Sequence, residues 1–195
     1  MALLSTYYLP GLCVEDHAVD VPLDWRGTSP ALLAGVDDPD PSRLCAASAD
    51  LKPDPAFAGK KIRLFYRTVC LPQNVGRDLP AIVYLQGGPG GAGPRVLDAQ
   101  TDGWLAEAVK YFRVVLPDQR GTGRSSAVDG HRMDQLRKEA LACGADPARL
   151  QANYLKRFLA DSIVRDFEYL RLTEFGGARW VTLGQSYGGF LTLCN

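Results

Sequence analysis

Three short apolar runs, each ending in a turn rich in glycine or polar residues, limit what this chain can fold into. They are residues 81–85, 114–116 and 180–183 of the 195-residue sequence. A short, continuous apolar run between turns is typical of a strand that is covered on both faces. The runs therefore predict buried strands whose carboxyl ends lead into three unusual turns.

Helical patterns separate these runs. Asp146 followed by Pro147 is typical of a helix N-terminus, and apolar residues recur at helical spacing over residues 163–170. We expect Asp161 to cap this second helix and the glycine pair 176–177 to end it. Strands that alternate with helices indicate an α/β fold with a mostly parallel sheet, whose reactive groups lie at the carboxyl ends of the strands.

The N-terminal part of the chain follows a different pattern. Residues 14–25 and 61–70 alternate apolar and polar side chains, which predicts two half-buried strands. Residues 37–59 are rich in Asp, Pro and Ala without apolar periodicity, so we expect a connection on the surface. Because both sides of this connection look like one sheet, residues 1–195 are interpreted as part of a single domain.

Composition excludes several classes of protein. Lys and Arg together number 22, as do Asp and Glu, so the net charge is zero, which argues against nucleic-acid and membrane-surface partners. No apolar stretch approaches the ~18 residues of a spanning helix, and the N-terminus has no basic segment of the kind that begins a signal peptide. The five cysteines are scattered without a C-x-x-C pair, which indicates neither disulfides nor a zinc site. We expect a reduced, cytoplasmic protein.

The turn after residue 183 carries a candidate nucleophile. Gly184, Ser186 and Gly188 form a G-x-S-x-G pattern between an expected strand and an expected helix. In such an elbow the serine lies on a sharp, strained turn that exposes its hydroxyl, and the glycines let strand and helix approach closely. The alternative interpretation is a glycine-rich turn whose serine is idle.

The turn after residue 85, with the sequence QGGPGG at 86–91, has the position of a loop that donates one backbone N–H to an oxyanion hole. The residue after the nucleophile, Tyr187, supplies the second N–H. We expect the Gly88–Pro89 bond to be cis, because such a tight turn is a usual place for cis proline. A plain structural turn is the alternative, whereas a phosphate loop is disfavoured because its Lys-containing motif is absent.

The turn at residues 118–125, DQRGTGRS, follows the second buried run, residues 114–116. We expect Asp118 and Arg120 to pair and to hold this loop against the sheet, in preference to contacting substrate. Asp118 is not the expected acid of a catalytic triad, because in this architecture the acid follows the serine in sequence.

Together, QGGPG, DQRGTGRS and GQSYGGF resemble the proline iminopeptidase (prolyl aminopeptidase) family of serine peptidases, as does the stretch at residues 160–166. The resemblance covers about residues 13–195 and implies the α/β-hydrolase fold. It implies release of an N-terminal residue, preferentially proline, from peptides with a free N-terminus, without metal or cofactor. It also implies that Ser186 is the nucleophile and that the N–H groups of Gly88 and Tyr187 form the oxyanion hole. Gln86 and Tyr187 depart from the histidine and tryptophan of many relatives, which leaves the fine substrate preference open.

A base for Ser186 is not evident. A triad in this architecture runs Ser, then Asp or Glu, then His, whereas the two histidines, His17 and His131, both precede the serine. We expect His17 to face solvent on a strand near the sheet edge and His131 to begin a polar helix. The chain is therefore interpreted as the N-terminal part of one α/β-hydrolase domain, truncated after the elbow and inactive alone.

Other interpretations stay open. An esterase or another serine hydrolase has the same elbow, whereas epoxide and haloalkane hydrolases are disfavoured because their elbow nucleophile is aspartate. A non-catalytic half-fold that binds a partner or a second chain is a third interpretation, and a homo-oligomer is compatible with the sequence. An acid and a C-terminal histidine beyond Asn195 would favour catalysis.

Overall fold

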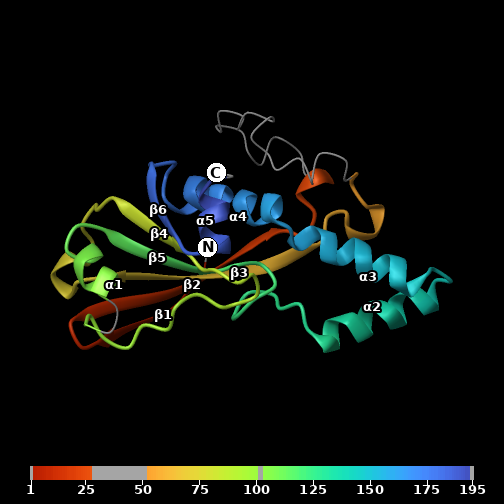
Figure 1. The fold of residues 1–195 in the computed structure, drawn as a ribbon, viewed down its shortest axis with the longest axis horizontal. Helices are drawn as coiled ribbons and strands as arrows, with labels where there is room; N and C mark the ends of the chain where they lie inside the picture. The colour runs from red at the N-terminus through yellow and green to blue at the C-terminus, as the bar shows by residue number, and fades with distance from the viewer. Residues whose placement is uncertain (1, 28–51, 101–102, 194–195) are drawn as a thin grey trace.

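The computed structural model describes residues 2–27, 52–100 and 103–193. Its centre is a six-stranded sheet in the order β1-β2-β3-β5-β4-β6, with helices on both faces (Figure 1). The strands are β1 Ala2–Leu9, β2 Leu12–Pro22, β3 Lys61–Cys70, β4 Ala81–Leu85, β5 Arg113–Asp118 and β6 Trp180–Gly184. The helices are α1 Gly103–Ala108, α2 Gly130–Ala142, α3 Pro147–Leu155, α4 Ala160–Glu174 and α5 Tyr187–Leu193.

The sheet is mixed, so the expectation of a mostly parallel sheet is correct only for its C-terminal half. β5, β4 and β6 pair in parallel, whereas β1, β2, β3 and β5 pair with one another in antiparallel fashion. The physical reason begins at the N-terminus, where Pro10 and Gly11 join β1 to β2 in a turn too short for a parallel connection. Strand β1 itself was not expected from the sequence.

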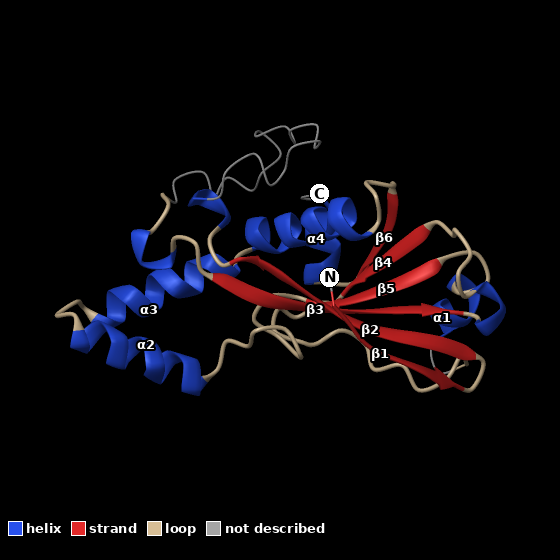
Figure 2. Cartoon of the chain, turned by 180° about the vertical axis from the view of Figure 1, so that it is seen from behind, coloured by secondary structure: helices blue, strands red, loops and turns tan. Residues whose placement is uncertain are grey.

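Two apolar clusters cover the two faces of the sheet. On one face, residues of β3, β4 and β5 pack against α4 and α5, including Phe167, Leu170 and Leu191. On the other, Ile82, Val114 and neighbouring residues pack against α1. β4 is continuously apolar because its side chains alternate between both clusters. Helices α2 and α3 extend away from the sheet (Figures 1 and 2).

Most expected elements are present at the expected places. β3 and β4 have the predicted bounds, and α3 begins at Pro147 with the Asp146 carboxylate accepting the Ala148 N–H at 3.0 Å. Helix α4 ends before Gly176 and Gly177, as expected. Part of the expected surface connection, residues 37–51, lies outside the described residues. No helix in the described part of the chain has the length and apolarity needed to cross a membrane.

Asp161 does not cap α4, which corrects the sequence interpretation. The helix begins at Ala160, its N-cap residue is Leu159, and no side chain caps it. The Asp161 carboxylate instead lies 3.1 Å from the guanidinium of Arg26. The Asp161 carboxylate therefore pairs with Arg26, in the segment after β2, and does not accept a capping hydrogen bond from the N–H groups of α4.

A buried ion pair joins the β5 end to α4. Arg120 donates to both carboxylate oxygens of Asp166, at 2.6 and 2.5 Å, and neither side chain is exposed. The same guanidinium donates to the carbonyls of Pro22, Leu23 and Arg157, and Trp25 donates to Asp166 at 2.8 Å. Burial raises the pKa of Asp166, while Arg120 and Trp25 act in the opposite direction. The network fastens β2, the loop after β5 and α4 together.

We expect Arg120→Met to lower the free energy of unfolding by about 3–5 kcal/mol, because it leaves the Asp166 carboxylate buried without its cation. Urea-induced unfolding followed by circular dichroism measures the change. Arg137→Met, the same substitution at an exposed position of α2, is the control and should change stability far less. Equal effects of the two substitutions would contradict this role of the buried pair.

Candidate active site

Ser186 occupies a strained turn at the carboxyl end of β6, directly before α5. Its backbone has a φ of 53°, and it is the one non-glycine residue with positive φ in the described part of the chain. That conformation costs an L-residue roughly 1–2 kcal/mol, so the surrounding packing must impose it. The residue is exposed, as an elbow nucleophile must be to reach a substrate.

The two glycines of the motif make this turn sterically feasible. A Cβ on Gly188 would lie 1.8 Å from the Leu85 carbonyl oxygen, and one on Gly184 would lie 2.3 Å from the Gly188 carbonyl oxygen. Neither position therefore admits any other residue without movement of backbone. The first turn of α5 is pressed against the ends of both β6 and β4.

The glycine-rich loop after β4 lies against the elbow. A Cβ on Gly87 would lie 2.8 Å from the Gln185 carbonyl oxygen and 3.2 Å from the Ser186 Cβ, so only glycine permits this approach. Gly88 has a φ of 117°, and the Gly88–Pro89 bond is cis, as predicted. The structure thus brings Gly88, Ser186 and Tyr187 to the carboxyl ends of the neighbouring strands β4 and β6.

Asp118 ties two loops together, but not through Arg120. Its carboxylate accepts the backbone N–H groups of Gly93 and Arg124, each at 2.7 Å. A Cβ on Gly123 would lie 2.2 Å from the same carboxylate. The expected Asp118–Arg120 pair is therefore wrong: the chain turns after β5, and Arg120 reaches Asp166 on the α4 side instead.

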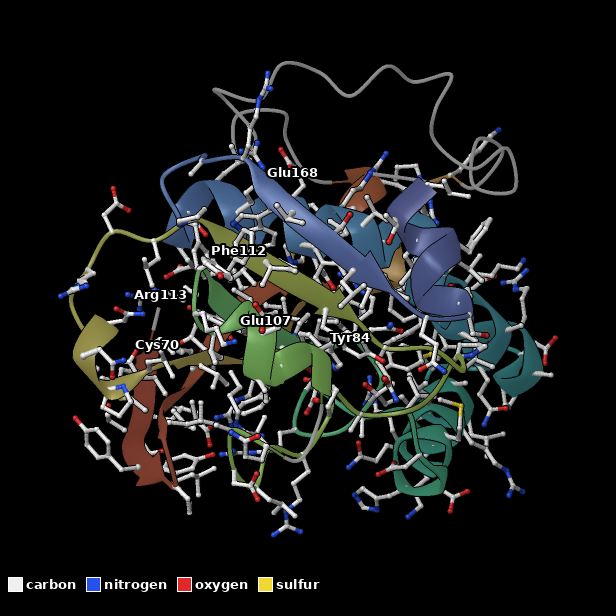
Figure 3. All side chains as sticks on the ribbon, turned by 60° about the vertical axis from the view of Figure 1, so that its left-hand side comes forward. Cys70, Tyr84, Glu107, Phe112, Arg113 and Glu168 are labelled. Carbon is white, nitrogen blue, oxygen red and sulfur yellow. The ribbon has the colours of Figure 1, made fainter. Side chains whose placement is uncertain are left out.

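Sequence reasoning missed Gln119, which lies between these two residues. Its side chain is buried and donates to the Gln86 carbonyl at 2.7 Å, so it joins the DQRG turn to the glycine-rich loop. The signal available in the sequence was its place in the DQRGTGRS turn, between Asp118 and Arg120, the two residues that were expected to hold this loop. Nearby, Tyr84, labelled in Figure 3, donates its hydroxyl to Gln185 at 3.2 Å and stacks on Trp104 of α1.

Asp16, on β2, holds the later part of the turn at residues 118–125, through Arg124. Asp16 accepts hydrogen bonds from Arg67, at 2.7 Å, and from Arg124. Burial opposes ionisation of Asp16, but the two guanidinium groups outweigh it and lower the pKa of this carboxyl. Arg124 also lies over the Phe65 ring, 4.1 Å from its centroid.

Neither histidine makes a hydrogen bond with Ser186 within the described residues. His17 is buried on β2, stacked on Tyr66 at 4.7 Å and 3.4 Å from the Thr68 hydroxyl, so the expectation that it faces solvent is wrong. β2 is not at the sheet edge, because β1 pairs with it, and the His17 ring is covered by side chains of the neighbouring strand β3. Burial lowers the pKa of His17, which favours its neutral form. His131 is exposed near the start of α2, where it contacts Gln135.

Comparison with known proteins identifies the family. The sequence profile of the alpha/beta hydrolase fold matches residues 80–194, so the chain belongs to the α/β-hydrolase fold family. The resemblance noted from the three motifs is also confirmed. The chain is 36% identical over 187 residues to a proline iminopeptidase from Aeromonas sobria, covering 96% of this chain and 35% of that protein.

A second relative and a solved structure extend this comparison. The proline iminopeptidase aneH from Aspergillus aculeatus is 36% identical over 139 residues, which are 68% of this chain and 28% of that protein. The chain therefore spans about a third of the length of these curated relatives. A hydrolase from Pseudomonas aeruginosa PA01 has a TM-score of 0.40 and 19% identity, over 67% of this chain and 35% of that one.

The contact between Gly188 and β4 gives a direct prediction. We expect Gly188→Ala to lower the free energy of unfolding by about 3 kcal/mol, because the added methyl group overlaps the Leu85 carbonyl. Gly189→Ala is the matched control on the same helix: its Cβ would lie 3.6 Å from the nearest atom, the Gly184 carbonyl oxygen. Thermal unfolding compares the two, and an equal tolerance of both alanines would contradict the close approach.

Proposed function

We propose that the protein containing this chain is a serine aminopeptidase that releases an N-terminal residue, preferentially proline, from peptides. The observation that carries the proposal is the strained, exposed Ser186 at the carboxyl end of β6, with Gly87 against its Cβ. The preference for proline is supported by the identity to two proline iminopeptidases.

In the proposed reaction the Ser186 hydroxyl oxygen attacks the carbonyl carbon of the first residue of the peptide. The carbonyl becomes an oxyanion, which accepts hydrogen bonds from the N–H groups of Gly88 and Tyr187. Collapse of this intermediate breaks the peptide bond and leaves the first residue as an ester on Ser186. The shortened peptide leaves as an amine, whose nitrogen takes from the base the proton that the serine hydroxyl lost. Water then hydrolyses the ester and regenerates the hydroxyl.

A histidine base and an orienting carboxylate are needed to take and return the serine proton. We propose that residues 1–195 are the N-terminal part of a single α/β-hydrolase domain and that the acid and the base follow Asn195. The proposal is supported by the chain's coverage of only 35% of the Aeromonas sobria relative and by the printed partners of the two histidines within the described residues, which are Thr68 for His17 and Gln135 for His131.

We also propose that the enzyme works in the cytoplasm on peptides with a free N-terminus. Support for a reducing compartment comes from Cys13, Cys70 and Cys143, which are free thiols.

The test is turnover of a chromogenic prolyl amide by the full-length protein. Ser186→Ala should lower kcat by about 10⁶-fold, since removal of a triad serine leaves only residual catalysis. The 195-residue chain by itself should show negligible turnover, because neither histidine hydrogen-bonds Ser186 in the part of the chain that the structure describes. The control is Ser126→Ala, on the loop after β5, which should leave kcat unchanged.

Full activity of the Ser186→Ala enzyme would overturn the assignment of the nucleophile. Turnover by the isolated chain that Ser186→Ala abolishes would show that one of the two upstream histidines serves as the base.

A further inference from the structure

We infer that Gln119 is a positioning residue that sets the orientation of the oxyanion-binding loop through the Gln86 carbonyl. The inference rests on the proposed function, because it assigns a role in that reaction to a residue outside the elbow. The observation behind it is the 2.7 Å hydrogen bond from the Gln119 side-chain amide to the Gln86 carbonyl oxygen.

The contact acts at the first peptide unit after β4. The Gln86 carbonyl and the Gly87 N–H belong to one planar peptide group, so a bond that fixes the oxygen also fixes the plane in which Gly87 begins. Gly87 is buried against Ser186 and is followed by Gly88, the proposed oxyanion donor. A rotation of this plane therefore displaces the Gly88 N–H relative to Ser186.

The Gln86 carbonyl is enclosed from a second side by the elbow. A Cβ on Gly188 would lie 3.1 Å from this oxygen, so the oxygen lies between the Gln119 amide and the first turn of α5. If an apolar residue replaced Gln119, the Gln86 carbonyl oxygen would face an apolar side chain on one side and the packed backbone of α5 on the other. The loop would then turn to find another donor.

Gln119 is itself held rigidly enough to act as a reference point. Its side chain is buried, with 2% of the residue exposed, and its backbone carbonyl accepts both the N–H and the hydroxyl of Thr122, at 3.0 and 2.8 Å. On either side of it, Asp118 holds Gly93 and Arg124, and Arg120 holds Asp166. The DQRG turn is therefore a fixed support, whereas the glycines at 87 and 88 have no side chains with which to fix themselves.

The expected effect is selective for the transition state. A donor that is misplaced by a fraction of an ångström still permits the substrate to bind but stabilises the oxyanion less. Displacements of this kind cost up to about 10²-fold in rate. Gln119→Met keeps the length of the side chain and removes its donor, so we expect kcat to fall about 10- to 100-fold with KM changed less than about twofold.

The experiment uses the full-length enzyme with a chromogenic prolyl amide and two inhibitors. A boronic acid analogue of proline forms a tetrahedral adduct with Ser186, whereas free proline occupies the site without one. Gln119→Met should weaken the boronate by a factor similar to the loss in kcat and leave the affinity for proline unchanged. Gln119→Asn keeps the amide but is too short to reach Gln86, so it should show the same losses in kcat and boronate affinity as Gln119→Met. It replaces Gln119→Met in the experiment if that variant does not fold. Gln73→Met, at an exposed position after β3, is the control and should match the unchanged enzyme.

Two results would overturn the inference while the proposed function stands, as judged by inactivity of Ser186→Ala. One is an unchanged kcat and boronate affinity in both Gln119 variants. The other is a parallel loss of affinity for proline, boronate and substrate, which would mean that Gln119 only supports the fold. Turnover that survives Ser186→Ala would instead remove the proposed function, and this inference with it.

Discussion

The close approach of α5 to the end of β4 is the constraint on which the candidate site depends. A methyl group at position 188 would overlap the Leu85 carbonyl, so the helix can begin at this height of the sheet only because Gly188 has no side chain. The chain must then turn from β6 into α5 within two residues. Ser186 is driven into a left-handed backbone conformation, with a φ of 53°, and is left exposed above the sheet.

The three turns at the carboxyl ends of β4, β5 and β6 form one mechanical unit. The loop after β4 contacts the elbow through Gly87. The loop after β5 in turn holds the loop after β4, through Gln119 and Asp118. Arg120 anchors that support to α4 through a pair that is buried from solvent. Asp118 and Gln119 thus hold the loop after β4 at two points, and Arg120 holds α4.

Local patterns were sufficient to predict much of this arrangement. Continuous apolar runs identify strands buried on both faces, and the elbow and the cis bond at Pro89 follow from steric demands within a few residues. The pairing of Arg120 was not predictable in this way, because its partner Asp166 lies 46 positions further along the chain. The burial of His17 was not predictable either, because its ring packs on Tyr66 of β3, a strand distant in the sequence. The mostly exposed β1, which removes β2 from the sheet edge, has no alternating pattern to reveal it.

Covalent labelling shows whether the elbow presents Ser186 as a nucleophile. The full-length protein is treated with a fluorophosphonate probe, digested, and examined by mass spectrometry. We expect a stoichiometric phosphonate adduct on the peptide that contains Ser186, and we expect no adduct when the protein is unfolded before the probe is added. No adduct, or an adduct on another serine while Ser186 stays unmodified, would contradict it.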